Sequence, residues 1–397
     1  MLTRRDFLQR SSLVALAPSV PGFVASSARA DQLQQPNDRV LVVIQLDGGN
    51  DGINTVVPFA DEGYARHRSA LRLPTHKLIK LDDEVALHPS LKAAAELIDD
   101  GRLAIVQGVG YPNPDRSHFR SMAIWHAGLT DAYEQSSDGW IGRALDSRRS
   151  ILAPGANSIF VGHEELPVAL RGRRSVAATL LRTEDATLQS DVNFKSTLGT
   201  SLPESELASY VHRTMLDAYT TSDQLAAMAG RNSDAARYPD TAFAARLQLI
   251  AQLIKSEAGP RVYYTSQSGY DTHSVQLPQH ARLLLNFGRG LKAFLDDLAA
   301  FGVDKRVLVL AFSEFGRRVA ENGSLGTDHG AAGPVFIAGP TASPGLIGRA
   351  PSLTDLEDGD LKVSIDFRQV YATVLDDWLG MDSEPILSGR FERLPLI

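Results

Sequence analysis

Short apolar runs alternate along the chain with longer segments in which apolar residues recur at helical spacing. Runs of about four to eight apolar residues indicate buried strands, and an apolar repeat of about 3.6 residues indicates a helix with one face on a core. The pattern predicts strands at 39–46, 103–109, 262–266, 307–312 and 334–338. It predicts helices at 91–100, 119–127, 241–257, 276–300 and 366–379.

This alternation predicts an α/β fold. Strands that are apolar along their whole length are covered on both faces, and parallel strands need long crossover connections, which are usually helices. We therefore expect a mainly parallel sheet sandwiched by helices, in a single domain over 31–397. Residues 131–240 are less regular; they contain a predicted helix at 204–228 and form a candidate insertion or cap region.

The first 30 residues have the parts of a cleavable export signal in the right order. Arg4 and Arg5 precede an apolar stretch at 13–24 and small residues around Ala30. A membrane-spanning helix needs about 20 mostly apolar residues, whereas this stretch is shorter and contains prolines. The segment resembles a twin-arginine signal peptide; a disordered basic tail is the alternative. We expect a periplasmic or otherwise exported protein that meets the twin-arginine export machinery and has no membrane span in its mature form.

The composition, 43% hydrophobic and 22% charged, is that of an ordinary globular protein. Loss of the signal removes four arginines and one aspartate, so the net charge of −7 becomes −10. An acidic surface disfavours nucleic acid as a partner, because that affinity comes mainly from lysine and arginine. The chain has no cysteine, so any metal must be held by oxygen and imidazole nitrogen.

Acidic and imidazole side chains follow several of the predicted strands. The carboxyl ends of parallel strands meet at one edge of a sheet, where ligands bind, so we expect these side chains to converge there. Carboxylate mixed with imidazole suits zinc, manganese or iron. The sequence therefore predicts a site for one or two divalent ions, most readily zinc or manganese. The candidate ligands are Asp47, Asp271, His273, Glu314, Asp328 and His329.

The turn-rich segment 111–120 offers a candidate nucleophile. Ser117 is predicted at a helix N-terminus, where backbone N–H groups and the helix dipole stabilise an anion. A neighbouring metal could lower the pKa of its hydroxyl, while Arg116 or Arg120 could hold a phosphoryl or sulfuryl oxygen. The alternative for Ser117 is an ordinary helix cap. Three roles are open for His118: a metal ligand, a residue that supports the ligands, or the start of the helix.

Some of the candidate ligands have simpler interpretations. Asp47 and Asp51 could stabilise the glycine turn at 48–52 through hydrogen bonds to the backbone. Glu314 could form a surface ion pair with one of the two arginines at 317–318, which would have little energetic consequence.

Six motifs together carry a family resemblance: LDGGNDG, LHP, PDRSHF, GYDTH, SEFGRR and GTDHG. The chain resembles the twin-arginine-exported family called domain of unknown function 1501, which is similar to the alkaline phosphatase and sulfatase superfamily. The resemblance implies a three-layer alkaline phosphatase-like fold. It also implies Asp47 as the first-strand ligand, Ser117 as the nucleophile, Asp271 and His273 as a ligand pair, and His329 as the late histidine ligand.

Glu314 departs from the superfamily pattern. Many hydrolases of the superfamily have adjacent aspartate and histidine at that point, whereas Phe315 follows Glu314 here. One metal ion, an altered ligand pair and a lost activity are all open. We expect an exported metal-dependent hydrolase acting on a small phosphate or sulfate ester. The alternatives are a noncatalytic binding or assembly protein with the same fold, and a metal-dependent enzyme of another reaction class.

Overall fold

The computed structural model describes residues 38–131, 136–147, 156–180, 238–256, 259–340 and 343–397. The predicted signal at 1–30 and the predicted helix at 204–228 lie outside these residues, as does much of the segment 131–240. The fold is that of the compact unit Arg39–Ile397.

A sheet of apolar strands forms the centre of this unit. Strand β1 (Val40–Asp47) lies between β8 (Val262–Ser268) and β9 (Val307–Phe312) and is parallel to both. The strand order is β11-β5-β10-β9-β1-β8-β6-β7, with β14 paired to β5. The remaining strands are β5 (Leu103–Gly110), β6 (Ser158–Val161), β7 (Ala177–Leu180), β10 (Gly333–Ala338), β11 (Gly345–Ile347) and β14 (Ile365–Asp366).

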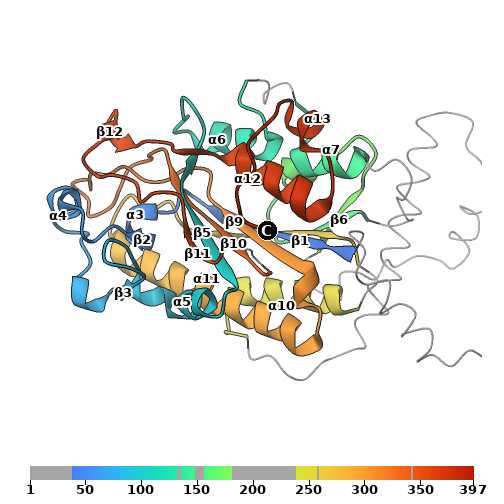
Figure 1. The fold of residues 1–397 in the computed structure, drawn as a ribbon, viewed down its shortest axis with the longest axis horizontal. Helices are drawn as coiled ribbons and strands as arrows, with labels where there is room; N and C mark the ends of the chain where they lie inside the picture. The colour runs from blue at the N-terminus through green and yellow to red at the C-terminus, as the bar shows by residue number, and fades with distance from the viewer. Residues whose placement is uncertain (1–37, 132–135, 148–155, 181–237, 257–258, 341–342) are drawn as a thin grey trace, which may run out of the picture. The chain divides into compact units, whose positions relative to one another are not determined.

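Helices cover both faces of the sheet (Figure 1). Successive strand side chains point to opposite faces: Val42 and Ile44 enter one hydrophobic core, whereas Leu41 and Val43 enter the other. The predicted α/β class with helices on both sides is confirmed. One layer contains α5 (Lys92–Asp99), α10 (Ala242–Lys255) and α11 (Gln276–Phe301). The other contains α6 (His118–Ala127), α7 (Trp140–Ser147), α12 (Phe367–Thr373) and α13 (Ser383–Leu387).

Strand β10 runs against the rest of the sheet. It pairs antiparallel with β5 and β9, whereas the other pairs of the main sheet are parallel. The physical reason is the connection between β9 and β10, which forms an extended hairpin, bridged at Arg317 and His329, instead of a crossover helix. The start of β10 therefore lies at the edge where the neighbouring strands end. This brings the segment Gly326–Gly330 to the edge that carries Asp47.

Smaller elements flank this edge. Helices α3 (Gly52–Thr55) and α4 (Glu62–His67) pack with a three-stranded sheet and share a third apolar cluster. That sheet consists of β2 (Val56–Val57), β4 (Ala86–Leu87) and β3 (Ile79–Lys80), and a separate pair consists of β12 (Leu356–Glu357) and β13 (Asp360–Leu361).

The predicted helix at 366–379 has two parts. Asp366 caps α12 and forms a capping box with Gln369, and the helix continues as a π-helix over Val374–Leu379. Throughout the described ranges, each helix is too short or too polar to cross a bilayer.

Candidate metal centre

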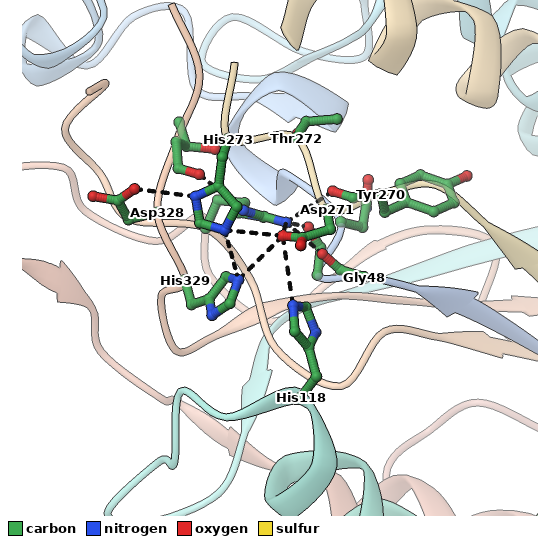
Figure 2. A network of polar contacts seen from close by, with 12 residues as sticks. Gly48, His118, Tyr270, Asp271, Thr272, His273, Asp328 and His329 are labelled. Atoms are coloured by element: carbon green, nitrogen blue, oxygen red, sulfur yellow. Dashed lines mark hydrogen bonds and ion pairs between the residues drawn. The ribbon is translucent and has the colours of Figure 1, made fainter. Parts of the chain in front are cut away.

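Two loops and one helix start bring imidazole and carboxylate groups together (Figure 2). Asp271 and His273 lie between β8 and α11, His329 lies in the loop before β10, and His118 is the first residue of α6. Ligand atoms of His118, Asp271 and His329 all lie within 4.8 Å of one another. These residues are far apart in sequence, so their proximity is a product of the tertiary fold.

One oxygen of Asp271 is the centre of the cluster. Its Oδ1 lies 3.0 Å from Nε2 of His273, 3.1 Å from Nε2 of His329 and 3.5 Å from Nε2 of His118. The Nε2 atoms of His273 and His329 are themselves 2.9 Å apart. Imidazole nitrogens and a carboxylate oxygen that point to one place are the donor set of a zinc site.

Each of the three rings is held from its other nitrogen. Nδ1 of His118 lies 2.8 Å from Oε1 of Glu314, Nδ1 of His273 lies 3.2 Å from Oδ1 of Asp328, and Nδ1 of His329 lies 2.8 Å from the carbonyl of Arg116. An acceptor at Nδ1 fixes the tautomer with the proton there, which leaves the lone pair of Nε2 for a metal. Burial also lowers the pKa of His329, which favours the neutral ring that can bind a metal.

Of the two candidates Glu314 and His118, the structure places only His118 in the compact group of possible ligands. Glu314 is buried, and its carboxylate accepts hydrogen bonds from Gly48 N at 2.9 Å and from Ser313 Oγ at 3.0 Å. Its hydrogen bond with His118 raises the pKa of that imidazole. Glu314 thus orients His118, and His118 takes the place among the candidate ligands. The surface ion pair of Glu314 with Arg317 or Arg318 does not form, because Glu314 is buried under His118.

Arg317 organises the loops around the cluster, whereas the sequence suggested it only as a possible surface ion-pair partner of Glu314. Its fully buried guanidinium donates to the carbonyls of Gly48, Gly49, Tyr270 and Thr327 and to Oδ1 of Asp271 at 2.7 Å. Although burial raises the pKa of Asp271, the hydrogen bond and the charge of Arg317 help to hold it at about 2. Asp271 is therefore an anion at neutral pH. No local pattern marked Arg317 as buried.

Asp47 lies beside the cluster but outside the compact group. Its Oδ1 accepts a hydrogen bond from Gln45 at 3.1 Å, and burial together with the charge of Glu314 raises its pKa. The turn that follows Asp47 requires glycine because it leaves no room for a side chain. A Cβ on Gly48, whose φ is +117°, would lie 2.4 Å from the nitrogen of Asp271. This close approach brings the β1 and β8 loops together.

Asp51 has a structural environment. Its carboxylate is fully buried, pairs with Arg68 at 2.6 Å and caps α3. It also accepts a hydrogen bond from Gln276, whose Oε1 receives the hydroxyls of Thr272 and Thr327 at 3.1 and 2.6 Å. This buried network fixes Thr272 and Thr327, and with them the two loops that carry His273 and His329.

Ser117 is the N-cap residue of α6 and is exposed. Within the described part of the chain its hydroxyl makes no capping hydrogen bond, although its N–H donates to Asp115 at 2.7 Å. The guanidinium of Arg116 pairs with the buried carboxylate of Asp360 through Nε and Nη2. Arg120 is 62% exposed, with only a 3.5 Å contact to Asp115.

An open cleft of about 480 Å³ lies against the cluster. Asp47, His118 and Asp271 contribute its polar part, and side chains of α6 contribute an apolar part. Clefts of about 300–1,000 Å³ are typical of small-molecule sites.

The fold and cluster define an α/β protein with a histidine-rich candidate metal centre at the carboxyl edge of its sheet. Residues 38–390 match the family described as "Protein of unknown function (DUF1501)", and the chain belongs to that family. The family resemblance inferred from the motifs is confirmed. Among curated proteins, none matches this sequence.

Several solved structures are similar in fold. A sulfatase from Pseudoalteromonas sp. is 13% identical with a TM-score of 0.40, over 93% of this chain and 72% of that one. A protein of the alkaline phosphatase superfamily from Vibrio parahaemolyticus is 12% identical with a TM-score of 0.42, over 89% and 69%. A phosphonate monoester hydrolase of Agrobacterium radiobacter is 11% identical with a TM-score of 0.37, over 89% and 78%. Likeness of this degree assigns no activity to this chain.

Proposed function

We propose that the protein is an exported, zinc-dependent hydrolase of small phosphate or sulfate esters. The observation that carries this proposal is the convergence of Nε2 of His118, His273 and His329 on one oxygen of Asp271. With each Nδ1 engaged by an acceptor, the compact group of His118, Asp271 and His329 offers two nitrogens and one carboxylate oxygen to a single cation. Nε2 of His273, 2.9 Å from that of His329, is a further candidate nitrogen. Zinc in catalytic sites is held by three protein ligands and keeps its fourth position for water or substrate.

The state of His118 supports this fit. Its Nε2 is buried and has no hydrogen-bond partner among the described residues; the 3.5 Å contact with Asp271 is too long to serve as one. An unsatisfied buried polar atom costs about 1–3 kcal/mol, which a bond to a metal ion would offset. Imidazole ligands favour zinc over manganese, because manganese prefers oxygen.

In this proposal Ser117 is the nucleophile. Its exposed hydroxyl lies at the start of α6, where the helix dipole and free N–H groups stabilise an anion, and Arg120 adds a positive charge one turn away. A bound zinc ion would act as a Lewis acid and lower the pKa of the hydroxyl. The oxygen of Ser117 attacks phosphorus or sulfur, the P–O or S–O ester bond breaks, and the alcohol leaves with a proton. Water then releases phosphate or sulfate and restores Ser117.

The test combines metal analysis with a substrate panel on the purified mature protein. We expect about one zinc ion per chain and hydrolysis of at least one phosphomonoester, phosphodiester or sulfate ester. Ser117→Ala should abolish turnover and leave the zinc content and the melting temperature unchanged. Ser69→Ala, at an exposed serine of another loop, is the matched control. Unchanged turnover in Ser117→Ala would remove this serine from the mechanism.

A noncatalytic binding or assembly protein that retains the metal centre is the second candidate. The observation in its favour is the position of Glu314, which is buried beneath His118 and is followed by Phe315. Asp47 also lies outside the compact group. Zinc binding without hydrolysis of any ester in the panel would favour this candidate.

A further inference from the structure

Phe119 is exposed in an unusual place. The described residues include four exposed large apolar side chains, namely Phe119, Val275, Phe301 and Leu325, and Phe119 is the most exposed of them at 91%. Of these four, Phe119 alone lines the cleft beside the metal centre. It directly follows His118, whose ring belongs to that centre. An aromatic ring held open to water at a site mouth is available to cover an apolar ligand.

The wall of the cleft along α6 is apolar. Met122 and Ala123 lie three and four residues after Phe119 and therefore share its face of the helix, and all three line the cleft together with Val168. His126 continues this face, but its Nε2 is directed to Oε1 of Gln45 at 3.1 Å and to the hydroxyl of Tyr264 at 3.2 Å. Burial lowers the pKa of His126 to about 3, so the ring adds no charge to this wall.

Asp47, Asp271 and His118 supply polar groups to the cleft. Because two of them are carboxylates, an anionic ester group can approach only where the metal centre offsets their charge. The remainder of the substrate then extends along the wall formed by Phe119, Met122 and Val168. That wall offers dispersion and apolar contact rather than hydrogen bonds to hydroxyl groups.

We propose that the cleft selects esters whose organic group is apolar, of the aryl or alkyl class, and that Phe119 is the side chain that covers this group. The proposal rests on the proposed hydrolase function for the identity of the ester group. A polar organic group, such as a sugar, would lose its hydrogen bonds to water against this wall and gain none in return.

The first experiment measures binding and does not depend on turnover. Titration calorimetry compares 1-naphthalenesulfonate with methanesulfonate on the zinc-loaded mature protein; the two probes share a sulfonate that cannot be hydrolysed and differ only in the organic group. We expect the naphthyl probe to bind at least about tenfold more tightly. Phe119→Ala should weaken it about tenfold and leave methanesulfonate unchanged. Equal affinity of the two probes for the wild type would overturn the proposal.

Phe301→Ala is the matched control. Phe301 is also an exposed phenylalanine, 53% accessible, but it ends α11, whose N-terminal end lies at the site. At about 1.5 Å per residue this places it more than 30 Å away along the helix. Naphthalenesulfonate affinity should be unchanged in this variant. The same loss in Phe119→Ala and Phe301→Ala would contradict a role for Phe119.

A second experiment separates this inference from the proposed function. The ratio of kcat/KM for 1-naphthyl and methyl esters of phosphate and sulfate should fall about tenfold in Phe119→Ala, through KM. If both esters are hydrolysed and the ratio does not change, the inference fails and the hydrolase stands. If no ester is hydrolysed but naphthalenesulfonate binding depends on Phe119, the hydrolase fails and the apolar cleft stands.

Discussion

Nε2 of His273 lies 2.9 Å from Nε2 of His329. Both nitrogens also lie within 3.1 Å of Oδ1 of Asp271, and the Nδ1 atom of each ring faces an acceptor. Two imidazoles with their protons on Nδ1 present two lone pairs to each other, which is unfavourable unless a proton or a cation lies between them. This pair therefore supports a metal ion at the centre of the cluster.

Replacement of either ring should reduce zinc affinity. His273→Ala and His329→Ala each remove one of the nitrogen ligands, and we expect zinc to bind at least about tenfold more weakly, the loss typical of changes even in the groups that support metal ligands. The measurement is competition with a zinc chelator of known affinity. His76→Ala is the control: this histidine is exposed and lies outside the cluster, so the variant should bind zinc as the wild type does. Wild-type affinity in both site variants would refute the proposed ligands.

Arg317→Ala should destabilise the fold strongly. Its buried guanidinium donates to four carbonyls and to Asp271, and each buried acceptor left without its donor costs about 1–3 kcal/mol. Urea unfolding measures the change. The neighbouring Arg318 is partly exposed and bonds the carbonyl of Asp358, so Arg318→Ala should cost at most about 1 kcal/mol. Equal losses in the two variants would contradict the organising role of Arg317.

Lowering the pH should remove the free energy that the ionised carboxylate of Asp51 contributes to folding. Although burial raises the pKa of Asp51, Arg68 lowers it from 3.8 to about 2. Since the folded-state pKa lies below the unfolded one, the contribution is complete above pH 4 and is lost as the pH falls toward 2; it is on the order of 2 kcal/mol. Urea unfolding of chelator-treated protein between pH 5 and pH 2 measures it.

Asp51→Asn should flatten this acid dependence. Asp355→Asn is its control, because Asp355 is an exposed partner of Lys362 and should leave the wild-type slope in place. An acid slope that is the same in both variants would show that another group causes it.

Replacement of the paired arginines Arg4 and Arg5 by lysine should block export. Twin-arginine signals depend on the paired arginines, so a variant with Arg4→Lys and Arg5→Lys should accumulate as precursor inside the cell. Cell fractionation with detection of the precursor and mature forms measures this. Arg10→Lys keeps the charge and the pair and should be exported normally. Efficient export of the double variant would contradict a twin-arginine route.

Sequence patterns placed the strands and most candidate ligands because their signals are local. Apolar runs marked β1, β5, β8 and β9, and the polar residues that follow three of them lie at one edge for a geometric reason that holds for all parallel strands. The direction of β10 could have been inferred as well, because no helical pattern separates 307–312 from 334–338. A connection without a helix favours an antiparallel pair.

The sequence by itself determined the layers of the fold, the absence of sulfur ligands and the strand ends from which Asp271, His273 and His329 project, since periodicity and residue type require no knowledge of distant contacts. Only the tertiary structure decided that His118 joins these residues while Glu314 supports it from beneath, and that Arg317 is buried. Those roles depend on contacts between distant residues: His118 meets Glu314, 196 residues away, and Arg317 meets Asp271, 46 residues away. Glu314 and Arg317 are buried, where an unpaired charge is costly. Residue spacing along the chain contains no information about that pairing.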